Sequence, residues 1–178
     1  MKKKTNPLGV SAIKKEADRV RKEYNAPLDS FFPIYEYITD LADKGLLTYQ
    51  ILEDDNPIFE EGEYGKYDPI TNTIYVKDCV DEELCDDIGR ARFTLAHELF
   101  HYIQIQVLKF EVVEVEEIEK SYEDAEWQAN EFAAQLLIPQ EYTTLEVEEI
   151  MEKFGVSEEC ALYRKVKTKK RNKDKKNG

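Results

Sequence analysis

Apolar side chains recur every three or four positions along much of the chain, a spacing typical of helices with one buried face. In residues 9–24 they form a single stripe, and similar stripes follow later in the sequence. Asp29, Ser30 and Ser121 stand where a capping residue would begin a helix, and Gly155 stands where a helix would end. We therefore predict helices over residues 9–24, 29–43, 88–107, 121–138 and 141–154, with a short last helix beginning at Ser157.

Segments rich in strand-forming residues lie between the second and third of these helices. Residues 46–53 read LLTYQILE, a composition that favours a β-strand. Residues 62–78 surround the turn sequence DPITN, which predicts a hairpin with arms near Tyr64–Tyr67 and Thr73–Lys77. Residues 111–120 have no clean period, so strand, loop and helix all stay open there. Helices before and after a small β-meander indicate an α+β fold.

The two ends of the chain differ from its centre in charge. Residues 1–8 are predicted to be a flexible basic segment, and residues 164–178 a disordered basic tail, because the tail is nearly free of apolar side chains. Residues 9–163 would then form a single domain. The net charge is −13; residues 1–22 carry about +6 and residues 164–178 about +8, which leaves about −27 on residues 23–163. So acidic a body would repel nucleic acid, which argues against direct DNA or RNA binding by its surface.

The sequence gives no sign of a membrane or a secretory route. No stretch approaches the roughly 18 apolar residues of a transmembrane helix, and the start lacks the apolar segment of a signal peptide. We therefore expect no membrane partner and a cytoplasmic location.

Both histidines of the chain lie in the sequence TLAHELFHYI, four positions apart. On a helix, residues four apart project from the same side, so His97 and His101 can reach one metal ion. Glu98 follows His97 and lies where its carboxylate can take a proton from an attacking water, the reason for the H-E-x-x-H spacing in zinc peptidases. A purely structural pair of histidines, without metal, is the competing interpretation.

A catalytic zinc site of this kind needs three protein ligands and one open position. The predicted helix 121–138 offers Glu126, and its apolar side carries small residues such as Ala129 and Ala133 that let another helix approach closely. Asn130, one turn after Glu126, faces the same way and could accept a hydrogen bond from the second nitrogen of a ligand histidine. On the pattern alone, an exposed acid in an acidic stretch explains Glu126 equally well.

Two segments resemble the ImmA/IrrE family of zinc metallo-endopeptidases, namely RFTLAHELFHY (92–102) and EWQANEFAAQLLIP (126–139). The resemblance extends to YGKYDPITNTIYV (64–76), which is similar to the β-hairpin of that family, and to KFGVSEECALYRK (153–165), which is similar to its C-terminal helices. It therefore covers roughly residues 10–165, and the first two segments are its most specific part.

The resemblance implies a zincin-like α+β domain that binds Zn²⁺. Its ligands would be His97, His101 and Glu126, with Glu98 as the general base. One departure is Phe100, which stands where the family very often has glycine. A bulky ring at this position could crowd the cleft or change which substrates it accepts.

The family also implies a class of substrate. Its understood members act inside the cell as anti-repressors, which cut a helix-turn-helix repressor of a mobile element, prophage or stress regulon. The expected partner is therefore such a repressor. The alternative is a zinc-bearing module that sequesters a regulator without cutting it, as a toxin–antitoxin or prophage partner would.

The transition state of peptide hydrolysis needs a hydrogen-bond donor for its oxyanion in addition to the metal. The chain has no third histidine, so a tyrosine is the natural candidate. The sequence does not choose among those nearest the relevant segments, which are Tyr64, Tyr67, Tyr75, Tyr102 and Tyr122.

Overall fold

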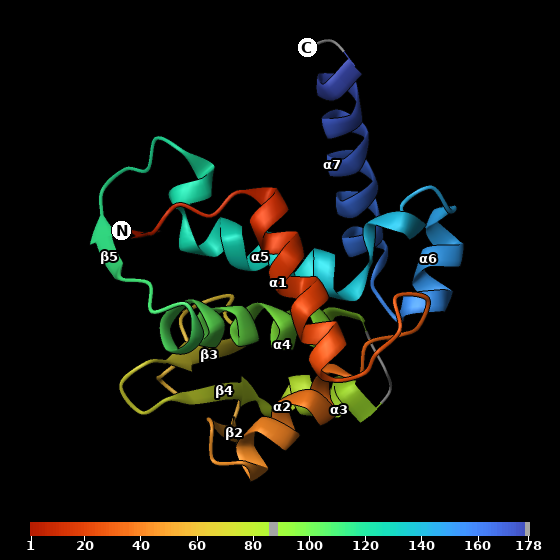
Figure 1. Ribbon diagram of the computed structural model, residues 1–178. Helices are drawn as coiled ribbons and strands as arrows, with labels where there is room; N and C mark the ends of the chain where they lie inside the picture. Colours follow the sequence, from red (N-terminus) through yellow and green to blue (C-terminus); the bar gives the residue numbers. More distant parts are fainter. Residues whose placement is uncertain (86–88, 177–178) are drawn as a thin grey trace.

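A computed structural model of the chain shows an α+β fold in which helices and a small sheet surround one central helix (Figure 1). It describes the backbone of residues 1–85 and 89–176, and the side chains of residues 1–82 and 89–169. In chain order the elements are β1 (Lys2–Thr5), α1 (Val10–Glu23), α2 (Ile34–Asp43), β2 (Thr48–Leu52), β3 (Gly65–Asp68), β4 (Thr73–Lys77), α3 (Asp78–Cys85), α4 (Gly89–Tyr102), β5 (Val112–Val115), α5 (Ala125–Leu137), α6 (Val147–Phe154) and α7 (Glu158–Lys176).

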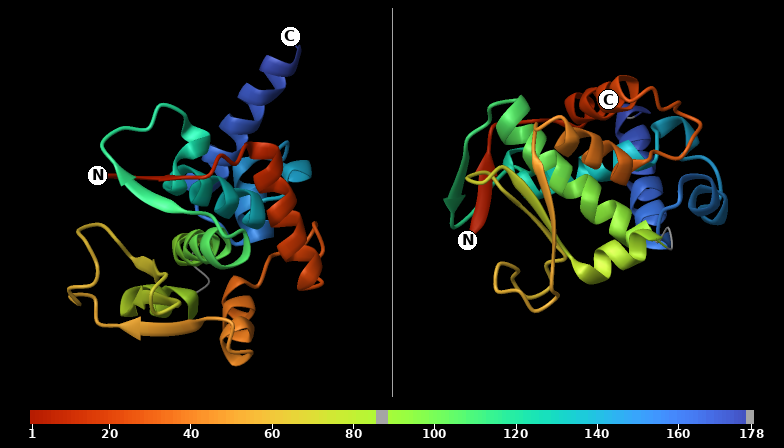
Figure 2. Two further views of the ribbon diagram at one scale, coloured as in Figure 1. Left: turned by 60° about the vertical axis from the view of Figure 1, so that its left-hand side comes forward. Right: turned by 90° about the horizontal axis from the view of Figure 1, so that it is seen from below.

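Helix α4, the central helix, carries the two histidines and lies between α5 on one side and the β3–β4 hairpin on the other (Figures 1 and 2). Its own apolar side chains are part of the core, and Ala91, Leu95 and Leu99 among them are fully buried. Helix α1 packs on α5 through the predicted stripe, of which Ile13, Ala17 and Val20 are buried. The histidine helix is therefore supported from both sides.

The larger sheet has the strand order β2-β4-β3. Its hairpin is confirmed, because β3 pairs antiparallel with β4 across the predicted turn. The predicted meander is wrong: β2 pairs with β4 rather than β3, and it does so in parallel. The long loop between β2 and β3 carries the chain past the position that β4 later fills. As a result β4 lies in the centre of the sheet and β3 lies at its edge.

Helix boundaries differ from the prediction wherever local chemistry overrides periodicity. Helix α2 begins only after Pro33, which stands at its N-cap. The predicted helix 88–107 is α-helical only to Tyr102 and continues as a π-helical turn over Ile103–Val107; its expected start at Ile88 lies outside the described residues. Helix α5 is capped by Asp124, not by Ser121. Gly155 ends α6 in the left-handed conformation, as predicted.

Both ends of the chain carry secondary structure that the sequence did not predict. Within residues 1–8, β1 pairs antiparallel with β5, the segment that the sequence left open. Two lysines of β1 form ion pairs with acids that no local pattern could match to them, Lys3 with Glu126 and Lys4 with Glu123. The tail is helical to Lys176 within α7, which projects from the body in Figure 1.

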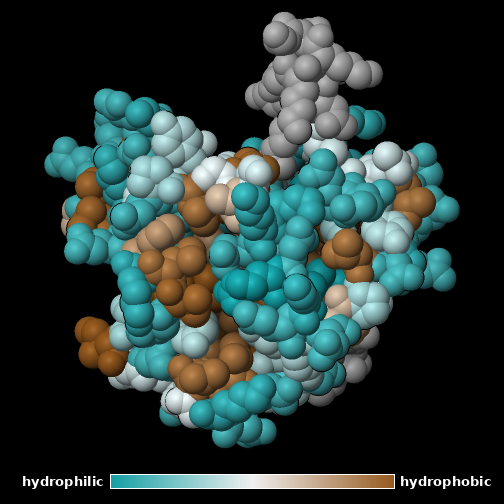
Figure 3. Space-filling model, in the orientation of Figure 1, coloured by the Kyte–Doolittle hydropathy of each residue, from teal (hydrophilic) through white to brown (hydrophobic). Residues whose placement is uncertain are grey.

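The chain is hydrophilic overall, with a mean hydropathy of −0.63. The face in Figure 3 is largely hydrophilic, with apolar side chains gathered near the middle of the view. Among the described residues, no helix is both long enough and apolar enough to cross a bilayer.

Candidate metal centre

The two predicted ligand helices meet where the first turn of α5 lies against the last two turns of α4. Both helices contribute small, fully buried residues, among them Ala96, Ala129 and Ala133. The side chain of Asp124 accepts hydrogen bonds from the backbone N–H groups at the start of α5, including that of Glu126 at 3.0 Å. This cap holds the residue that carries the third expected ligand.

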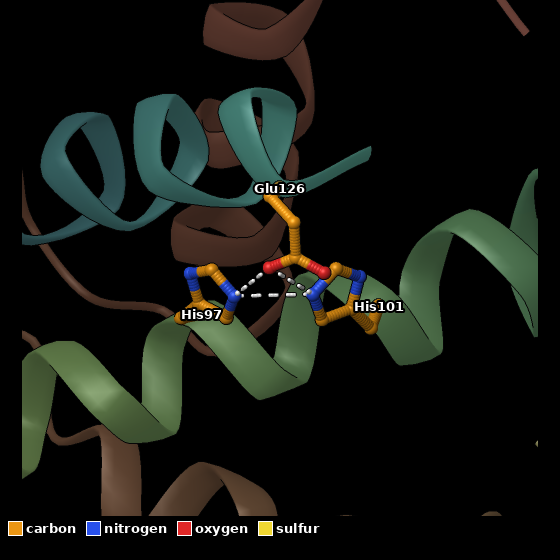
Figure 4. Close-up of side chains that lie close together, drawn as sticks. All are labelled: His97, His101 and Glu126. Carbon is orange, nitrogen blue, oxygen red and sulfur yellow. Dashed lines mark hydrogen bonds and ion pairs between the residues drawn. The ribbon is translucent and has the colours of Figure 1, made fainter. Parts of the chain in front are cut away.

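His97, His101 and Glu126 point toward one another from the two helices (Figure 4). The two Nε2 atoms are 3.1 Å apart, and Glu126 Oε2 lies 3.1 Å from that of His97 and 3.5 Å from that of His101. Ligand atoms arranged tetrahedrally around zinc at about 2.0–2.1 Å lie about 3.3–3.4 Å from one another. The three atoms therefore have the spacing of one face of a zinc coordination shell.

The opposite nitrogens of both rings face side-chain oxygens. His97 Nδ1 is 3.0 Å from Asn130 Oδ1, the partner suggested by the sequence, and His101 Nδ1 is 2.9 Å from Gln104 Oε1. Each Nδ1 therefore donates its proton, so in a neutral ring each Nε2 has only a lone pair to offer. Two such lone pairs and a carboxylate oxygen converge, an arrangement that a cation satisfies.

Glu98 is buried beside this cluster and is fixed by strand β3. Its Oε2 accepts a hydrogen bond from the backbone N–H of Tyr67 at 2.7 Å. Strand and helix approach so closely here that a Cβ on Gly65 would lie 2.8 Å from Thr94 Cγ2 and 3.1 Å from Glu98 Cγ. The glycine permits this contact, and the carboxylate is thereby oriented.

Comparison with known proteins decides the family. Residues 59–165, which are 107 of the 178 in the chain, match the peptidase family M78, described as the IrrE N-terminal-like domain. The chain belongs to this family. M78 is a metallopeptidase family, and the cluster of His97, His101 and Glu126 is able to hold a metal ion.

A solved structure with the same overall fold is that of a Mycobacterium tuberculosis transcriptional regulator, with a TM-score of 0.57 and 18% sequence identity. The match covers 86% of this chain and 46% of that one, so this chain spans less than half the length of the regulator. At this identity the likeness shows the fold alone. No curated protein matches the chain.

The metal centre of this M78 chain opens into a cleft of about 560 Å³. Its floor is α4; one wall is β3 and the other is the β1–β5 ribbon. The ribbon contributes Lys3, whose Nζ lies 3.0 Å from Glu126 Oε1, and Glu114. Sequence reasoning missed Lys3, because nothing in the local pattern links the first strand to a residue 123 positions away.

Of the five tyrosines considered from the sequence, Tyr64 and Tyr67 line this cleft. The hydroxyl of Tyr67 already donates to Asn72 Oδ1 at 2.8 Å. The other three are not among the cleft residues that the structure describes: Tyr75 has its hydroxyl 3.4 Å from Thr71 Oγ1, Tyr102 packs edge-on against the Tyr67 ring, and Tyr122 lies beside Lys120.

Phe100 does not lie in the cleft. Its ring is fully buried and stacks on Phe132 of α5, with ring centroids 4.5 Å apart and planes 24° from parallel. The expectation that this ring would crowd the cleft is therefore wrong. Position 100 faces α5, where the extra volume fills the core between the two helices.

The electrostatics of the cluster favour a cation. Burial lowers the pKa of His97, but its hydrogen bond to Glu126 and the charges of Glu98 and Glu126 outweigh that effect and raise the pKa. Burial raises the pKa of Glu126, but hydrogen bonds from the two histidines outweigh it and hold that pKa far below its usual range. Glu126 is thus an anion paired with positive charge, which either a proton on His97 or a metal ion can supply.

Proposed function

We propose that the chain is a zinc-dependent endopeptidase that acts in the cytoplasm and cuts a helix-turn-helix transcriptional repressor. The observation that carries the proposal is the triangle of His97, His101 and Glu126, with Glu98 fixed beside it. When bound there, zinc supplies a Lewis acid that lowers the pKa of water toward about 7 and polarises a peptide carbonyl. Membership of a metallopeptidase family supports the reaction class.

The two oxygens of Glu98 have separate tasks in this reaction. Oε2 accepts the Tyr67 N–H, which keeps the carboxylate in one orientation. Oε1 would take a proton from the attacking water and deliver it to the leaving amine. Asn130 holds the ring of His97 from behind, as an outer partner of a metal ligand does.

The negative charge that develops on the substrate carbonyl needs a donor from the protein as well. Tyr64 and Tyr67 line the cleft, but the Tyr67 hydroxyl is already engaged with Asn72. Lys3 is a further candidate, because its half-exposed ammonium group lies at the same end of the cleft as Glu126.

The cleft can receive an extended peptide along β3. Directly before this strand Tyr64 O accepts from Lys77 N of β4, while within it the Tyr67 N–H turns away from β4 toward Glu98. Since β3 is an edge strand that lines the cleft, a substrate strand could add along its open edge beside the Tyr67 N–H. The body charge of about −27 would steer a basic DNA-binding domain toward it.

The proposal is tested by mixing the protein with the repressor encoded next to its gene, with zinc and with a chelator. Fragments that appear only with zinc would support the peptidase. A stable intact complex would indicate instead a zinc-bearing module that sequesters its partner. Elemental analysis that finds no zinc in the purified protein would favour a structural histidine pair.

Glu98→Gln provides the matched comparison. The amide oxygen can still accept the Tyr67 N–H, but the side chain cannot take up a proton, so zinc binding should persist while cleavage falls by about 10²- to 10⁴-fold. Glu63→Gln, which alters another acid lining the cleft, is the control and should still cut. Unchanged proteolysis by Glu98→Gln would refute Glu98 as the base.

A further inference from the structure

Two fully buried glutamines lie behind the metal centre, and neither lines the cleft. Gln104 Oε1 faces His101 Nδ1 at 2.9 Å, and Gln104 Nε2 donates to Gln128 Oε1 at 2.8 Å. Gln128 Nε2 in turn donates to two backbone carbonyls, those of Asn6 at 2.9 Å and Tyr122 at 2.8 Å. A continuous series of hydrogen bonds thus runs from the backbone to an expected metal ligand.

The direction of this series is set at its far end. Backbone carbonyls only accept hydrogen bonds, so the NH₂ group of Gln128 must face them and its oxygen must face Gln104. That oxygen also only accepts, so the NH₂ group of Gln104 faces it, and the oxygen of Gln104 faces His101. If either amide were reversed, two donors or two acceptors would face each other and stay without hydrogen bonds in a buried place, which costs free energy.

We propose that Gln104 and Gln128 are positioning residues that keep His101 in the tautomer and orientation of a metal ligand. With Gln104 Oε1 as its neighbour, Nδ1 carries the proton of the neutral ring, and the lone pair of Nε2 points toward Glu126 and His97. The inference rests on the metal centre of the proposed function, but it does not require that the protein cuts a substrate.

Gln104 lies in the π-helical turn Ile103–Val107, which directly follows α4. A π-turn inserts extra backbone into a helix and changes the direction of the side chains that follow, and such turns are frequent at functional sites. Here it begins two residues after His101, and Gln104, three positions after His101 and thus its neighbour on a helix, lies against Nδ1. The backbone carbonyl of Gln104 accepts from Phe110 N at 2.8 Å, which fixes the turn from the other side.

The series also joins the metal centre to the N-terminal segment. Asn6 follows β1 directly, and its side-chain Oδ1 accepts a hydrogen bond from Glu111 N at 3.0 Å. Its carbonyl is therefore held in place by the β1–β5 ribbon when it accepts from Gln128. A segment far from the histidines in sequence thus helps to orient one of them.

The first test measures zinc affinity by competition with a chromophoric chelator. Gln104→Met and Gln128→Met keep nearly the same side-chain shape but remove the hydrogen bonds, and each should raise the zinc dissociation constant by about 10- to 100-fold. Gln135→Met is the matched control: Gln135 is buried on the same side of α5 two turns later and donates to the Val10 carbonyl, but no hydrogen bond joins it to a ligand. The control should stay within about twofold of the wild type, since it leaves the outer partners of the ligands intact.

The second test reads the tautomer directly, by ¹⁵N NMR of the histidine rings in metal-free protein at a pH where both rings are neutral. The wild type should show His101 protonated at Nδ1, and Gln104→Met should show a mixture of tautomers. A wild-type His101 protonated at Nε2 would overturn the proposal, even if the variants fail to fold. So would variants whose zinc affinity matches that of Gln135→Met. A wild type that binds no zinc would instead refute the metal centre of the proposed function, and the tautomer would still be measurable.

Discussion

The buried side and the open side of the metal centre are built from different chemistry. Behind the ligands, neutral amides and stacked rings are fully enclosed, as Gln104, Gln128 and Phe100 show. In front of them, the cleft is lined by partly exposed charges such as Lys3 and Glu114. Hydrogen bonds are strongest where water is excluded, whereas exposed charges remain free to meet a partner. The buried side is therefore suited to fixing the ligands, and the open side to selecting a substrate.

The largest effect on stability is expected from the buried side, with Phe100→Ala. Removing a fully buried ring that stacks on Phe132 should lower the free energy of unfolding by about 3–5 kcal/mol, measured by denaturant titration. Because the ring lies outside the cleft, the bonds that are cut should not change. An altered cleavage pattern with unchanged stability would contradict this division between the two sides.

Loss of a ligand should be next in size. Glu126→Ala removes one corner of the triangle, and we expect zinc affinity to fall by more than about 100-fold, beyond the loss expected for an outer partner. Chelator competition measures this, with Glu123→Ala as the control, since that acid pairs with Lys4 rather than with the histidines. Equal affinities in the two variants would exclude Glu126 as a ligand.

The contact between β3 and α4 connects the two sides. A Cβ on Gly65 would collide with Thr94 and Glu98, so Gly65→Ala should displace the carboxylate and lower the cleavage rate by about 10- to 100-fold. Zinc affinity should be unchanged. Gly9→Ala meets open space and is the control. A full cleavage rate in Gly65→Ala would show that the position of Glu98 is not critical.

Zinc binding should displace a proton from His97. The raised pKa of His97 means that its protonated form stabilises the metal-free fold fully below about pH 6.5, and this contribution is lost as the pH rises through the folded-state pKa. Zinc needs the neutral ring, so its binding should release a proton wherever the pH lies below the folded-state pKa of His97. Calorimetry in buffers of different ionisation enthalpy measures the release. A binding enthalpy that does not depend on the buffer would contradict it.

The smallest effect on stability is expected on the open side. Lys3→Met breaks a half-exposed ion pair with Glu126 and should change the free energy of unfolding by less than about 1 kcal/mol. If Lys3 contacts the substrate oxyanion, the same variant should nonetheless slow turnover by about 10-fold or more. Lys4→Met, one residue along β1, is the control. Equal turnover rates in the two variants would show that Lys3 pairs with Glu126 but does not contact the substrate oxyanion.

The candidate site could be predicted from sequence wherever one helix positions its own residues. Spacing places His97, Glu98 and His101 on one helix, and Glu126 and Asn130 on another, and the structure brings these two sets together. Gln104 and Gln128 were missed, although the position of Gln104 three residues after His101, a spacing that makes helical residues neighbours, was a usable signal. Periodicity assumes an unbroken α-helix, so it could not reveal the π-helical turn.

The fold was predictable to a similar extent. The stripe of α1 and the β3–β4 hairpin follow from local pattern, and both are confirmed. The pairing of β1 with β5 was not predictable, because it joins segments more than 100 residues apart and neither segment carries a local pattern that points to the other. The parallel pairing of β2 with β4 likewise depends on how the intervening loop returns across the sheet.

The position of β1 has a practical consequence for anyone who purifies this protein. A polyhistidine tag fused ahead of Lys2 would begin at a strand whose next residue, Lys3, already contacts Glu126. Imidazoles tethered there could coordinate the same ion and give misleading metal stoichiometry, or obstruct the cleft. A tag after α7 would start at the far end of a helix that projects from the body (Figure 1), so affinity and kinetic measurements should use that end.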